Sequence, residues 1–424
     1  MLASAPPTTT GEMIMRAFDA GWGGAIIKTA GPHGEKIENP NPRFAALHAG
    51  RSRMIGFQNI ELISDRPTSV WLEECRIIKD RYPEHVLVGS IMAAGSAKED
   101  WQQLVVEFQD AGCDLMELNL GCPHGMPERG MGSVCSQNPE ITGNITKWAK
   151  EVAKVPILIK LSPNVTDITV PGRAAADNGA DALTAINTVN IMMGVDIDTF
   201  EPLPSVAGHS TYGGYSGVAV RPIALKAISD LARKIPGIPL SATGGIANWR
   251  DAVEFLLVGA RTLQVCTEVM HHGFGIVGPM KRGLERYMEE HGFSSLEEMI
   301  GLTVPKITDH SKLPLGYKPK AAIDGAKCIK CDLCYVACED SGYQAISISH
   351  ARSSPVKDKG VPEIHVNLCT GCSLCQHVCP VDCIDLQEVP GATLDESYKQ
   401  LSVGPDARYL GAARWKKQTV PAQA

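Results

Sequence analysis

The chain has 424 residues, 44% of them hydrophobic, and its 40 basic and 47 acidic residues give a formal net charge of −7 at pH 7. This length suggests about two or three domains, or one α/β barrel with an appended domain. The longest apolar runs, residues 155–159 and 255–258, are far shorter than the ~20 residues that span a bilayer. The charges are scattered, which excludes a basic stripe for nucleic acid and a polybasic membrane anchor. We therefore expect a soluble, cytoplasmic protein with neither partner.

Over the first 310 residues, short apolar runs alternate with longer amphipathic stretches. Two of these stretches, residues 100–111 and 248–259, have apolar side chains at helical spacing, and glycines at 112, 179 and 259 mark exits from helices. Eight β units over about 300 residues favour a (β/α)8 TIM barrel, an α/β fold, over an open doubly wound sheet. The eight predicted strands are residues 2–4, 25–28, 86–91, 115–120, 157–161, 182–187, 240–243 and 262–265.

Polar or small residues stand at the carboxyl ends of the predicted strands. In barrels of this type the active site lies at those ends, and buried polar groups there need partners that a ligand supplies. The set comprises Lys28, Thr29, Asn119, Lys160, Asn187, Thr188, Gly244, Gly245, Cys266 and Thr267.

Two segments near the last strands suit a phosphate group. Residues 241–246 (Ser-Ala-Thr-Gly-Gly-Ile) and 264–267 (Gln-Val-Cys-Thr) are small enough for backbone N–H groups to approach an anion. An ordinary glycine-rich turn is the structural alternative. No G-x-G-x-x-G follows a predicted strand, so we expect no nicotinamide dinucleotide domain in this chain.

The segment 117–132 leaves the fourth strand as a glycine-rich loop that carries Cys122 and resembles a lid. With an ordinary pKa near 8.5, this thiol is mostly protonated at neutral pH and can serve as a general acid. Cys135 is the rival thiol of the loop. Cys75 and Cys113 suit the role of small buried hydrophobes better, because they lie in helical or turn contexts.

The last quarter of the chain differs in composition. Residues 311–326 contain two prolines and two glycines without periodicity and predict a linker, and residues 327–388 hold nine of the 14 cysteines. We expect 327–388 to form a small α+β ferredoxin-like domain. Residues 389–424 are rich in Gly, Pro and charge and predict a loosely ordered tail.

Two consecutive C-x2-C-x2-C-x3-C runs, of which the second is followed by Pro380, are typical of bacterial-type domains with two [4Fe-4S] clusters. In such runs the fourth cysteine reaches the other cluster. Zinc is the alternative, but zinc sites pair two short Cys or His clips, and a disulfide framework requires an oxidising compartment. The predicted ligand sets are Cys328, Cys331, Cys334 with Cys379, and Cys369, Cys372, Cys375 with Cys338. Because such clusters carry single electrons, whereas most metabolic reductions need a hydride, a flavin is the expected converter.

Several stretches resemble the dihydropyrimidine dehydrogenase family. The similarity extends from residue 2 to Pro380 and joins a barrel to a two-cluster domain without a nicotinamide domain, as in the PreA-type subunits of the bacterial two-subunit enzyme. The stretches are Asn-Ile-Glu at 59–61, ELNLGCPHGMPERGMG at 117–132, KLSPNVTDI at 160–168, INTVN at 186–190, YGGYSG at 212–217, SATGGI at 241–246 and LQVC at 263–266.

The resemblance implies a role for each matching residue. It implies Cys122 as the general acid, and FMN as the bound flavin. The pyrimidine edge would be held by Asn59, Glu61, Asn119, Asn187 and Thr188, because an amide both donates to a carbonyl and accepts from a ring N–H. The FMN contacts would be Lys28, Thr29, Lys160, Ala3, Ser4, Ser216, Gly217, Gly244, Gly245, Cys266 and Thr267.

The activity implied by the resemblance is reversible, NAD-dependent reduction of the 5,6-double bond of uracil or thymine, with hydride delivered to C6 and the proton of Cys122 to C5. A separate FAD-containing flavoprotein would oxidise NADH and supply electrons through both clusters, in a hetero-oligomer built on a homodimer of barrels. Three positions depart from the family. Gly121 stands where relatives often have Ser, Glu339 rather than Pro follows Cys338, and the chain begins almost inside its first strand.

Two other functions remain open. A dihydroorotate dehydrogenase shares the barrel, FMN and the N-L-x-C-P loop, but that family usually continues Cys-Pro-Asn, whereas His124 stands here, and its catalytic chain lacks a fused ferredoxin. An electron-transfer module with the barrel as a scaffold is the second alternative. The polar set at the strand ends argues against it.

Overall fold

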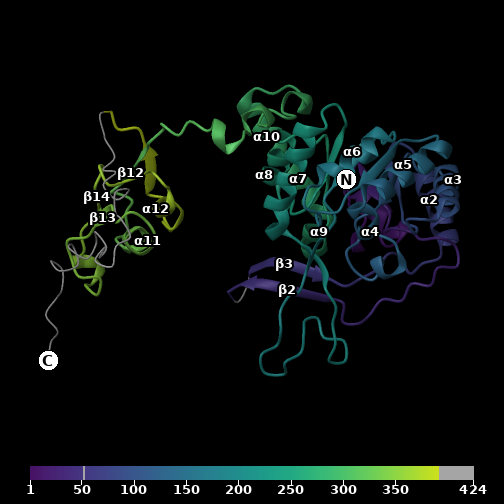
Figure 1. Ribbon diagram of the computed structural model, residues 1–424, viewed down its shortest axis with the longest axis horizontal. Helices are drawn as coiled ribbons and strands as arrows, with labels where there is room; N and C mark the ends of the chain where they lie inside the picture. Colours follow the sequence, from purple (N-terminus) through teal and green to yellow (C-terminus); the bar gives the residue numbers. More distant parts are fainter. Residues whose placement is uncertain (51–52, 391–424) are drawn as a thin grey trace. The chain divides into compact units, whose positions relative to one another are not determined.

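The computed structural model describes residues 1–50 and 53–390, and the chain divides into two compact units (Figure 1). The first unit is Met1–Ile307, and the second begins at Thr308. The expected tail, residues 389–424, lies almost wholly outside the described residues.

The first unit is a closed barrel of parallel strands, as predicted. Its sheet has the order β1-β4-β5-β6-β7-β10-β11, and Leu2 closes the ring by parallel bridges to Ala25 and Val265. The first predicted strand is thus a single bridging residue, flanked by Leu2 N donating to Gly24 O and Ala3 N donating to Val265 O. The strand bounds are β1 Gly24–Ile26, β4 Val86–Ile91, β5 Leu115–Asn119, β6 Ile157–Lys160, β7 Ala182–Ala185, β10 Leu240–Thr243 and β11 Thr262–Gln264.

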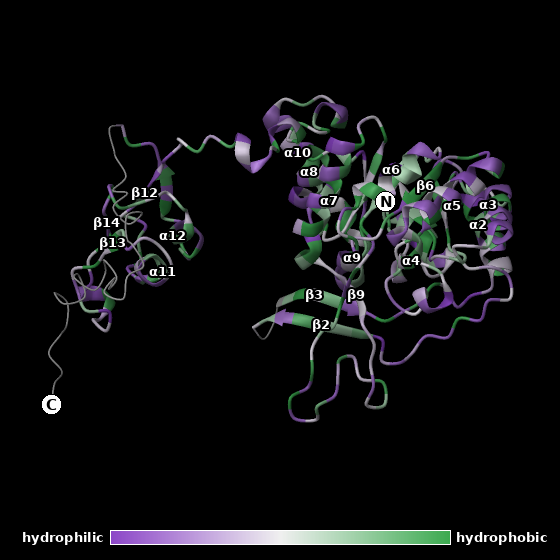
Figure 2. Ribbon diagram, viewed as in Figure 1, coloured by the Kyte–Doolittle hydropathy of each residue, from purple (hydrophilic) through white to green (hydrophobic). Residues whose placement is uncertain are grey.

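Helices cover the outside of the barrel, with polar residues on their outer faces (Figure 2). The helical spacing in 100–111 is confirmed by α3, whose Trp101 and Phe108 are fully buried. Asn248 caps α8 by accepting hydrogen bonds from Arg250 N and Asp251 N, which fixes its first turn. The helices are α1 Gly11–Asp19, α2 Thr68–Arg81, α3 Lys98–Asp110, α4 Ser133–Gln137, α5 Pro139–Val152, α6 Thr169–Asp177, α7 Arg221–Lys234, α8 Trp249–Leu257, α9 Thr267–His272 and α10 Val277–His291.

A second, antiparallel sheet of the order β2-β3-β9-β8 is built from two insertions far apart in sequence, and the sequence analysis missed it. Strands β2 (Phe44–Ala49) and β3 (Arg53–Asn59) form a hairpin (Figure 1), and β8 (Val189–Ile191) and β9 (Gly213–Ser216) join it. Phe57 pairs with Ser216 and Asn59 with Gly214. The Tyr215 ring crosses the partner strand at Gly56, where a Cβ would lie 1.8 Å from the Tyr215 hydroxyl.

The second unit is a small α+β domain with two short antiparallel ladders. Strand β12 (Lys320–Ile323) pairs with β15 (Ile384–Gln387), and β13 (Ile346–Ser347) pairs with β14 (Glu363–Ile364). Helices α11 (Leu333–Ser341) and α12 (Leu374–His377) contain cysteines of the two runs. Strand β12 lies inside the segment 311–326 that was expected to be a linker, so part of that segment belongs to this unit. Four residues between Pro and Gly signals were too few to reveal a strand.

Within the described residues, no helix is both long enough and apolar enough to cross a membrane.

Candidate active site

One cavity at the carboxyl ends of the barrel strands contains the whole predicted site. Its empty volume is about 1110 Å³, part of which is open to solvent. Its lining includes every barrel residue that the resemblance assigns to FMN, the pyrimidine or the general acid, namely Ala3, Ser4, Lys28, Thr29, Asn59, Glu61, Asn119, Cys122, Lys160, Asn187, Thr188, Ser216, Gly217, Gly244, Gly245, Cys266 and Thr267.

The second sheet forms one wall of this cavity and adds residues that the sequence analysis did not identify. Phe44, Phe57 and Tyr215 line the cavity from β2, β3 and β9. Phe44 and Phe57 stack on one another, with ring centroids 5.3 Å apart. Tyr215 lies in a glycine-rich stretch that had been noted. The two phenylalanines carried no signal, because only long-range strand pairing brings them to the site.

Three neighbouring polar side chains form a hydrogen-bonded chain across the strand ends. Asn187 Nδ2 donates to Asn119 Oδ1 (2.8 Å), and Asn119 Nδ2 donates to Thr29 Oγ1 (2.9 Å). Thr188 N donates to Asn187 Oδ1 (2.8 Å). Each amide is thereby fixed in orientation before a ligand arrives, which lowers the entropy that binding costs.

A glutamate joins two cations at the edge of the cavity. Glu61 Oε2 lies 2.5 Å from Lys28 Nζ, and Glu61 Oε1 lies 3.0 Å from Arg43 Nε. Both Lys28 and Glu61 side chains are about nine-tenths buried. Arg43 was not anticipated, and its position follows from the hairpin that begins at Phe44. The two cations thus lie against both oxygens of one buried carboxylate at this edge of the cavity.

The cavity floor has a buried ion pair. Lys160 Nζ lies 3.2 Å from Glu117 Oε1, and the other oxygen of Glu117 accepts from Gln264 Nε2 (3.0 Å). Glu117 is fully buried, so its carboxylate fixes both a cation and an amide. Within the described residues, Gln264 Oε1 is buried without a hydrogen-bond partner. Neither Glu117 nor Gln264 was identified as functional from the sequence.

Cys122 lies on the cavity wall beside His124. Its Sγ donates weakly to His124 O (3.5 Å), and burial raises the pKa of the thiol, against smaller opposing effects of that hydrogen bond and of Lys28. His124 Nε2 lies 2.9 Å from Glu61 O, a carbonyl that can only accept, so Nε2 carries the proton. Burial lowers the pKa of His124, and its Nδ1 has no hydrogen-bond partner among the described residues.

The rival thiol is in a different environment. Cys135 in α4 is fully buried in the hydrophobic core, where its Sγ lies close to Gly95, and burial raises its pKa to about 12. Cys75 and Cys113 are buried together with their sulfurs 3.7 Å apart, which agrees with their expected role as small hydrophobes.

The departure at Gly121 has a steric explanation. A Cβ at this position would lie 2.5 Å from the Cβ of Asn187, so a serine here requires Asn187 to move. The loop packs closely against the site residue. The absence of a side chain at Gly121 therefore allows the close contact between the loop and Asn187.

Two glycines form a cradle at the end of β10. Gly244 and Gly245 have φ of +123° and +81°, which favours glycine, and a Cβ on Gly245 would lie 2.9 Å from the backbone nitrogen of Arg221. Their backbone lines the cavity next to the first turn of α7. Such an arrangement suits a phosphate group.

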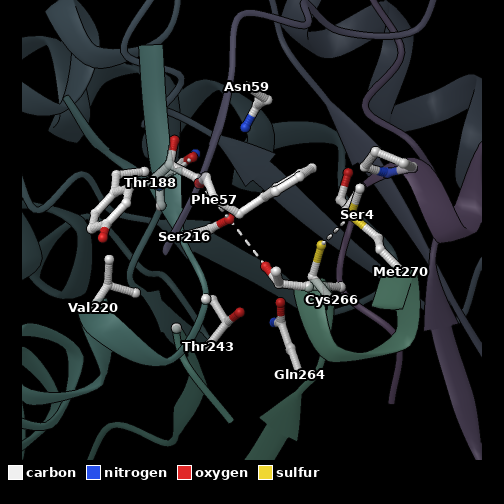
Figure 3. A pocket seen from close by; sticks show the side chains of 18 of the residues that line it. Ser4, Phe57, Asn59, Thr188, Ser216, Val220, Thr243, Gln264, Cys266 and Met270 are labelled. Carbon is white, nitrogen blue, oxygen red and sulfur yellow. Dashed lines mark hydrogen bonds between the residues drawn. The ribbon is translucent and has the colours of Figure 1, made fainter. Parts of the chain in front are cut away.

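Around this cradle, Thr267 Oγ1 donates to Ser216 Oγ (3.0 Å), and Cys266 Sγ lies 3.8 Å from Met270 Sδ (Figure 3). Figure 3 shows Asn59 across the cavity from these residues, with Gln264 reaching up from β11. Burial raises the pKa of the Cys266 thiol to about 11, so it stays protonated at neutral pH.

The cysteines of the second unit lie in two cavities, divided as the runs predict. One cavity is lined by Cys328, Cys331, Cys334 and Cys379. The other is lined by Cys369, Cys372, Cys375 and Cys338. In both cases three cysteines of one run meet the fourth cysteine of the other run. The departure at Glu339 does not separate Cys338 from its set.

Comparison with known proteins matches both units. Residues 1–288 match the family model of dihydroorotate dehydrogenase, and residues 321–386 match that of the 4Fe-4S dicluster domain. The chain is 39% identical over 391 residues to the NAD-dependent dihydropyrimidine dehydrogenase subunit PreA of Escherichia coli K12, and the match covers 92% of each chain.

Two further relatives cover less of the chain. Dihydropyrimidine dehydrogenase (NADP(+)) of Arabidopsis thaliana chloroplasts is 41% identical over 323 residues, 74% of this chain and 76% of the relative. The catalytic subunit of dihydroorotate dehydrogenase B (NAD(+)) of Pyrococcus abyssi is 38% identical over 304 residues, 72% of this chain and 94% of the relative.

Both units, their order and the length of the matches agree. The chain therefore belongs to the dihydroorotate dehydrogenase family of oxidoreductases, as a member that also carries a 4Fe-4S dicluster domain, together with the PreA subunits of dihydropyrimidine dehydrogenase.

Proposed function

We propose that this chain is the pyrimidine-reducing subunit of an NAD-dependent dihydropyrimidine dehydrogenase and reduces the 5,6-double bond of uracil or thymine reversibly. The observation that carries the proposal is the match of 391 residues to the PreA subunit, because it includes the dicluster unit as well as the barrel. Similarity of the barrel alone does not distinguish this activity from dihydroorotate oxidation, because the chain is also 38% identical over 304 residues to a dihydroorotate dehydrogenase subunit.

The barrel cavity fits FMN, the flavin that this family binds. A glycine cradle at Gly244 and Gly245 offers backbone N–H groups to a phosphate, and the buried ammonium of Lys160 faces the cavity from below. When bound, FMN supplies the hydride chemistry that exchanges with C6 of the pyrimidine. Lys160 would favour negative charge on the flavin. Lys28, Thr29, Ala3, Ser4, Ser216, Gly217, Cys266 and Thr267 would complete its contacts.

The amide chain would orient the pyrimidine. Asn59, Asn119 and Asn187 line one cavity, and each has an amide that matches a carbonyl next to a ring N–H. Glu61 and Thr188 would add an acceptor and a hydroxyl. Because Asn119 and Asn187 already hold one another, the ring would meet groups whose orientation is set.

Cys122 would hold and deliver the proton at C5. Its Sγ lies in the cavity wall, and burial raises the pKa of the thiol, so it stays protonated at neutral pH. The neutral His124 next to it keeps Nε2 on a backbone carbonyl, so its unpartnered Nδ1 can accept a hydrogen bond from the substrate side. The surroundings of Cys135 in the core support Cys122 as the acid.

The second unit would hold two [4Fe-4S] clusters on the two cysteine sets, which carry electrons one at a time when bound. A separate FAD-containing flavoprotein would oxidise NADH and supply these electrons, in a hetero-oligomer built on a barrel homodimer. The name of the PreA relative as one subunit supports a partner. A cytoplasmic location follows from the proposal, because cluster ligands must remain reduced thiolates.

The test is substrate-dependent turnover. Anaerobically purified chain should contain about one FMN and eight irons, as two four-iron clusters require. With its flavoprotein partner it should oxidise NADH when uracil or thymine is added, and not when neither is present. Turnover with orotate while uracil is inert would assign the chain to dihydroorotate chemistry instead. Bound FMN that no pyrimidine reoxidises would indicate an electron-transfer module.

A further inference from the structure

The ferredoxin unit contains an internal repeat whose two copies differ next to the cysteines. Eight residues before the first cysteine of each run stand Lys320 (328 − 8) and Val361 (369 − 8), followed by Ala321 and Pro362. The copies cross over, because Ala321 lines the cavity of the second cysteine set and Pro362 lines that of the first. Equivalent positions therefore act on different clusters.

The first difference is a buried cation. Lys320 is only 1% exposed, and its Nζ donates to Cys369 O at 2.6 Å, within the second set. Its counterpart in the repeat, Val361, is 39% exposed and uncharged. A positive charge thus lies against one cysteine loop, at a position where the repeat has an uncharged residue beside the other loop.

The second difference is a backbone hydrogen bond to sulfur. Ala321 N donates to Cys369 Sγ at 3.5 Å. Pro362, at the equivalent position beside the first set, has no N–H to donate. The approach of this segment is close, since a Cβ on Gly371 would lie 2.2 Å from Pro319 O. The donor at Ala321 is therefore fixed by backbone packing.

The third difference is a carboxylate. Asp332 and Ser373 occupy equivalent places in the two runs and share a left-handed backbone, with φ of 62° and 65°. Asp332 is 3% exposed and lines the first cavity, whereas Ser373 lines the second. Lys359 Nζ (2.5 Å) and His350 Nε2 (3.1 Å) balance part of the Asp332 charge.

Two contacts act in the opposite direction. Lys330 N donates to Cys328 Sγ at 3.4 Å, within the first set. Cys383 Sγ lies 3.5 Å from Cys379 Sγ, so its thiol can donate to a ligand of the first set, where the second set has Ala345. A thiol is a weak donor. Among the described residues, each set accepts two backbone N–H donors at sulfur. The buried ammonium of Lys320 is therefore the difference that favours the second set.

We propose that the buried ammonium of Lys320 makes the cluster held by Cys369, Cys372, Cys375 and Cys338 the easier of the two to reduce, so that it receives the first electron. Reduction adds one electron and one negative charge to a cluster. A nearby cation and N–H donors to sulfur stabilise that charge, and a carboxylate opposes it. The inference rests on the proposed function only in requiring that both sets hold [4Fe-4S] clusters.

The experiment is a dithionite titration of the intact chain, with each reduction step followed by electron paramagnetic resonance. Lys320→Met should lower the reduction potential of the more easily reduced cluster. The partition of the first electron between the two clusters should change at least tenfold, which corresponds to 59 mV for a one-electron couple. Lys320→Arg retains the positive charge, so this variant should keep the reduction potential of the unmodified chain. Pro362→Ala introduces a backbone N–H beside the first set and should raise the reduction potential of the cluster that this set holds.

Both Lys320→Met and Pro362→Ala should therefore reduce the difference between the two reduction potentials. The first lowers the higher potential, and the second raises the lower one. Unchanged steps in both variants, or a shift of the same step by both, would overturn the inference. Iron and sulfide analysis separates this outcome from failure of the proposed function, because a chain without eight irons has no clusters to compare. Should Lys320→Met fail to fold, Pro362→Ala alone still decides, since it leaves Lys320 in place.

Discussion

The barrel is held by a hydrophobic core whose fully buried Trp71, Trp101 and Phe255 do not line the cavity, although Ile186 and Ile246 belong to both. In the ferredoxin unit, four of the eight buried core residues are cysteines, and three of these belong to the predicted ligand sets. The barrel therefore can fold first and bind its cofactor afterwards. In the second unit three predicted ligands belong to the core, so we expect folding and cluster binding to be coupled.

The largest effect is expected when the iron-sulfur clusters are removed, because this change should separate the stabilities of the two units. Chelation of iron under oxidising conditions should abolish the unfolding transition of the second unit and leave that of the barrel, because metal binding supplies much of the folding free energy of small metal domains. Scanning calorimetry with limited proteolysis measures both. A second unit that resists protease without iron would contradict the shared role of its cysteines.

The next effect concerns the acid in the barrel. Cys122→Ala should lower turnover by about 10²- to 10⁴-fold, the usual contribution of a general acid, with both cofactors retained. Cys135→Ala is the matched control, because it removes a thiol from the same loop region but from the core side. It should lower stability and leave most of the turnover. The reverse result would move the role to Cys135.

The cradle can be tested separately from the clusters. Gly245→Ala places a Cβ 2.9 Å from Arg221 N at a φ of +81°, and such strain costs on the order of 1–3 kcal/mol. The purified variant should lose FMN and keep its iron, as absorbance and iron analysis would show. Gly237→Ala has an equally left-handed φ of +93° in open space and is the control for backbone strain alone. Equal loss of FMN in both variants would show that the cradle has no specific role in FMN binding.

The smallest effect is on pH dependence. Since burial raises the pKa of Cys122, the donor form persists above the ordinary cysteine value and is lost only as pH rises through the raised one. Turnover limited by the proton step should stay nearly constant between pH 7 and pH 8.5, whereas an ordinary cysteine would lose about half of its donor form over this range. A fall already centred near pH 8.5 would show an exposed thiol.

The sequence predicted features that are local and missed those that depend on distant pairing. Cysteine spacing and the residues that end each strand, such as Lys160 and Asn119, follow from short patterns, because strand ends of a parallel barrel meet at one rim. The sheet that carries Phe44 and Phe57 does not, since β3 finds its partner β9 more than 150 residues later. No sequence pattern links Gln264 to Glu117, and only the structure shows that these two residues pair across the barrel floor.

The contact of Tyr215 with Gly56 has a consequence for how long a ligand stays bound. The two insertions are joined by backbone pairing and by this ring, which covers a residue that has no side chain. Because the two insertions are paired in this way, we expect them to move as one piece. Residence time would then depend on the strength of the β3–β9 seam, so distant changes in either insertion would alter release without touching the ligand.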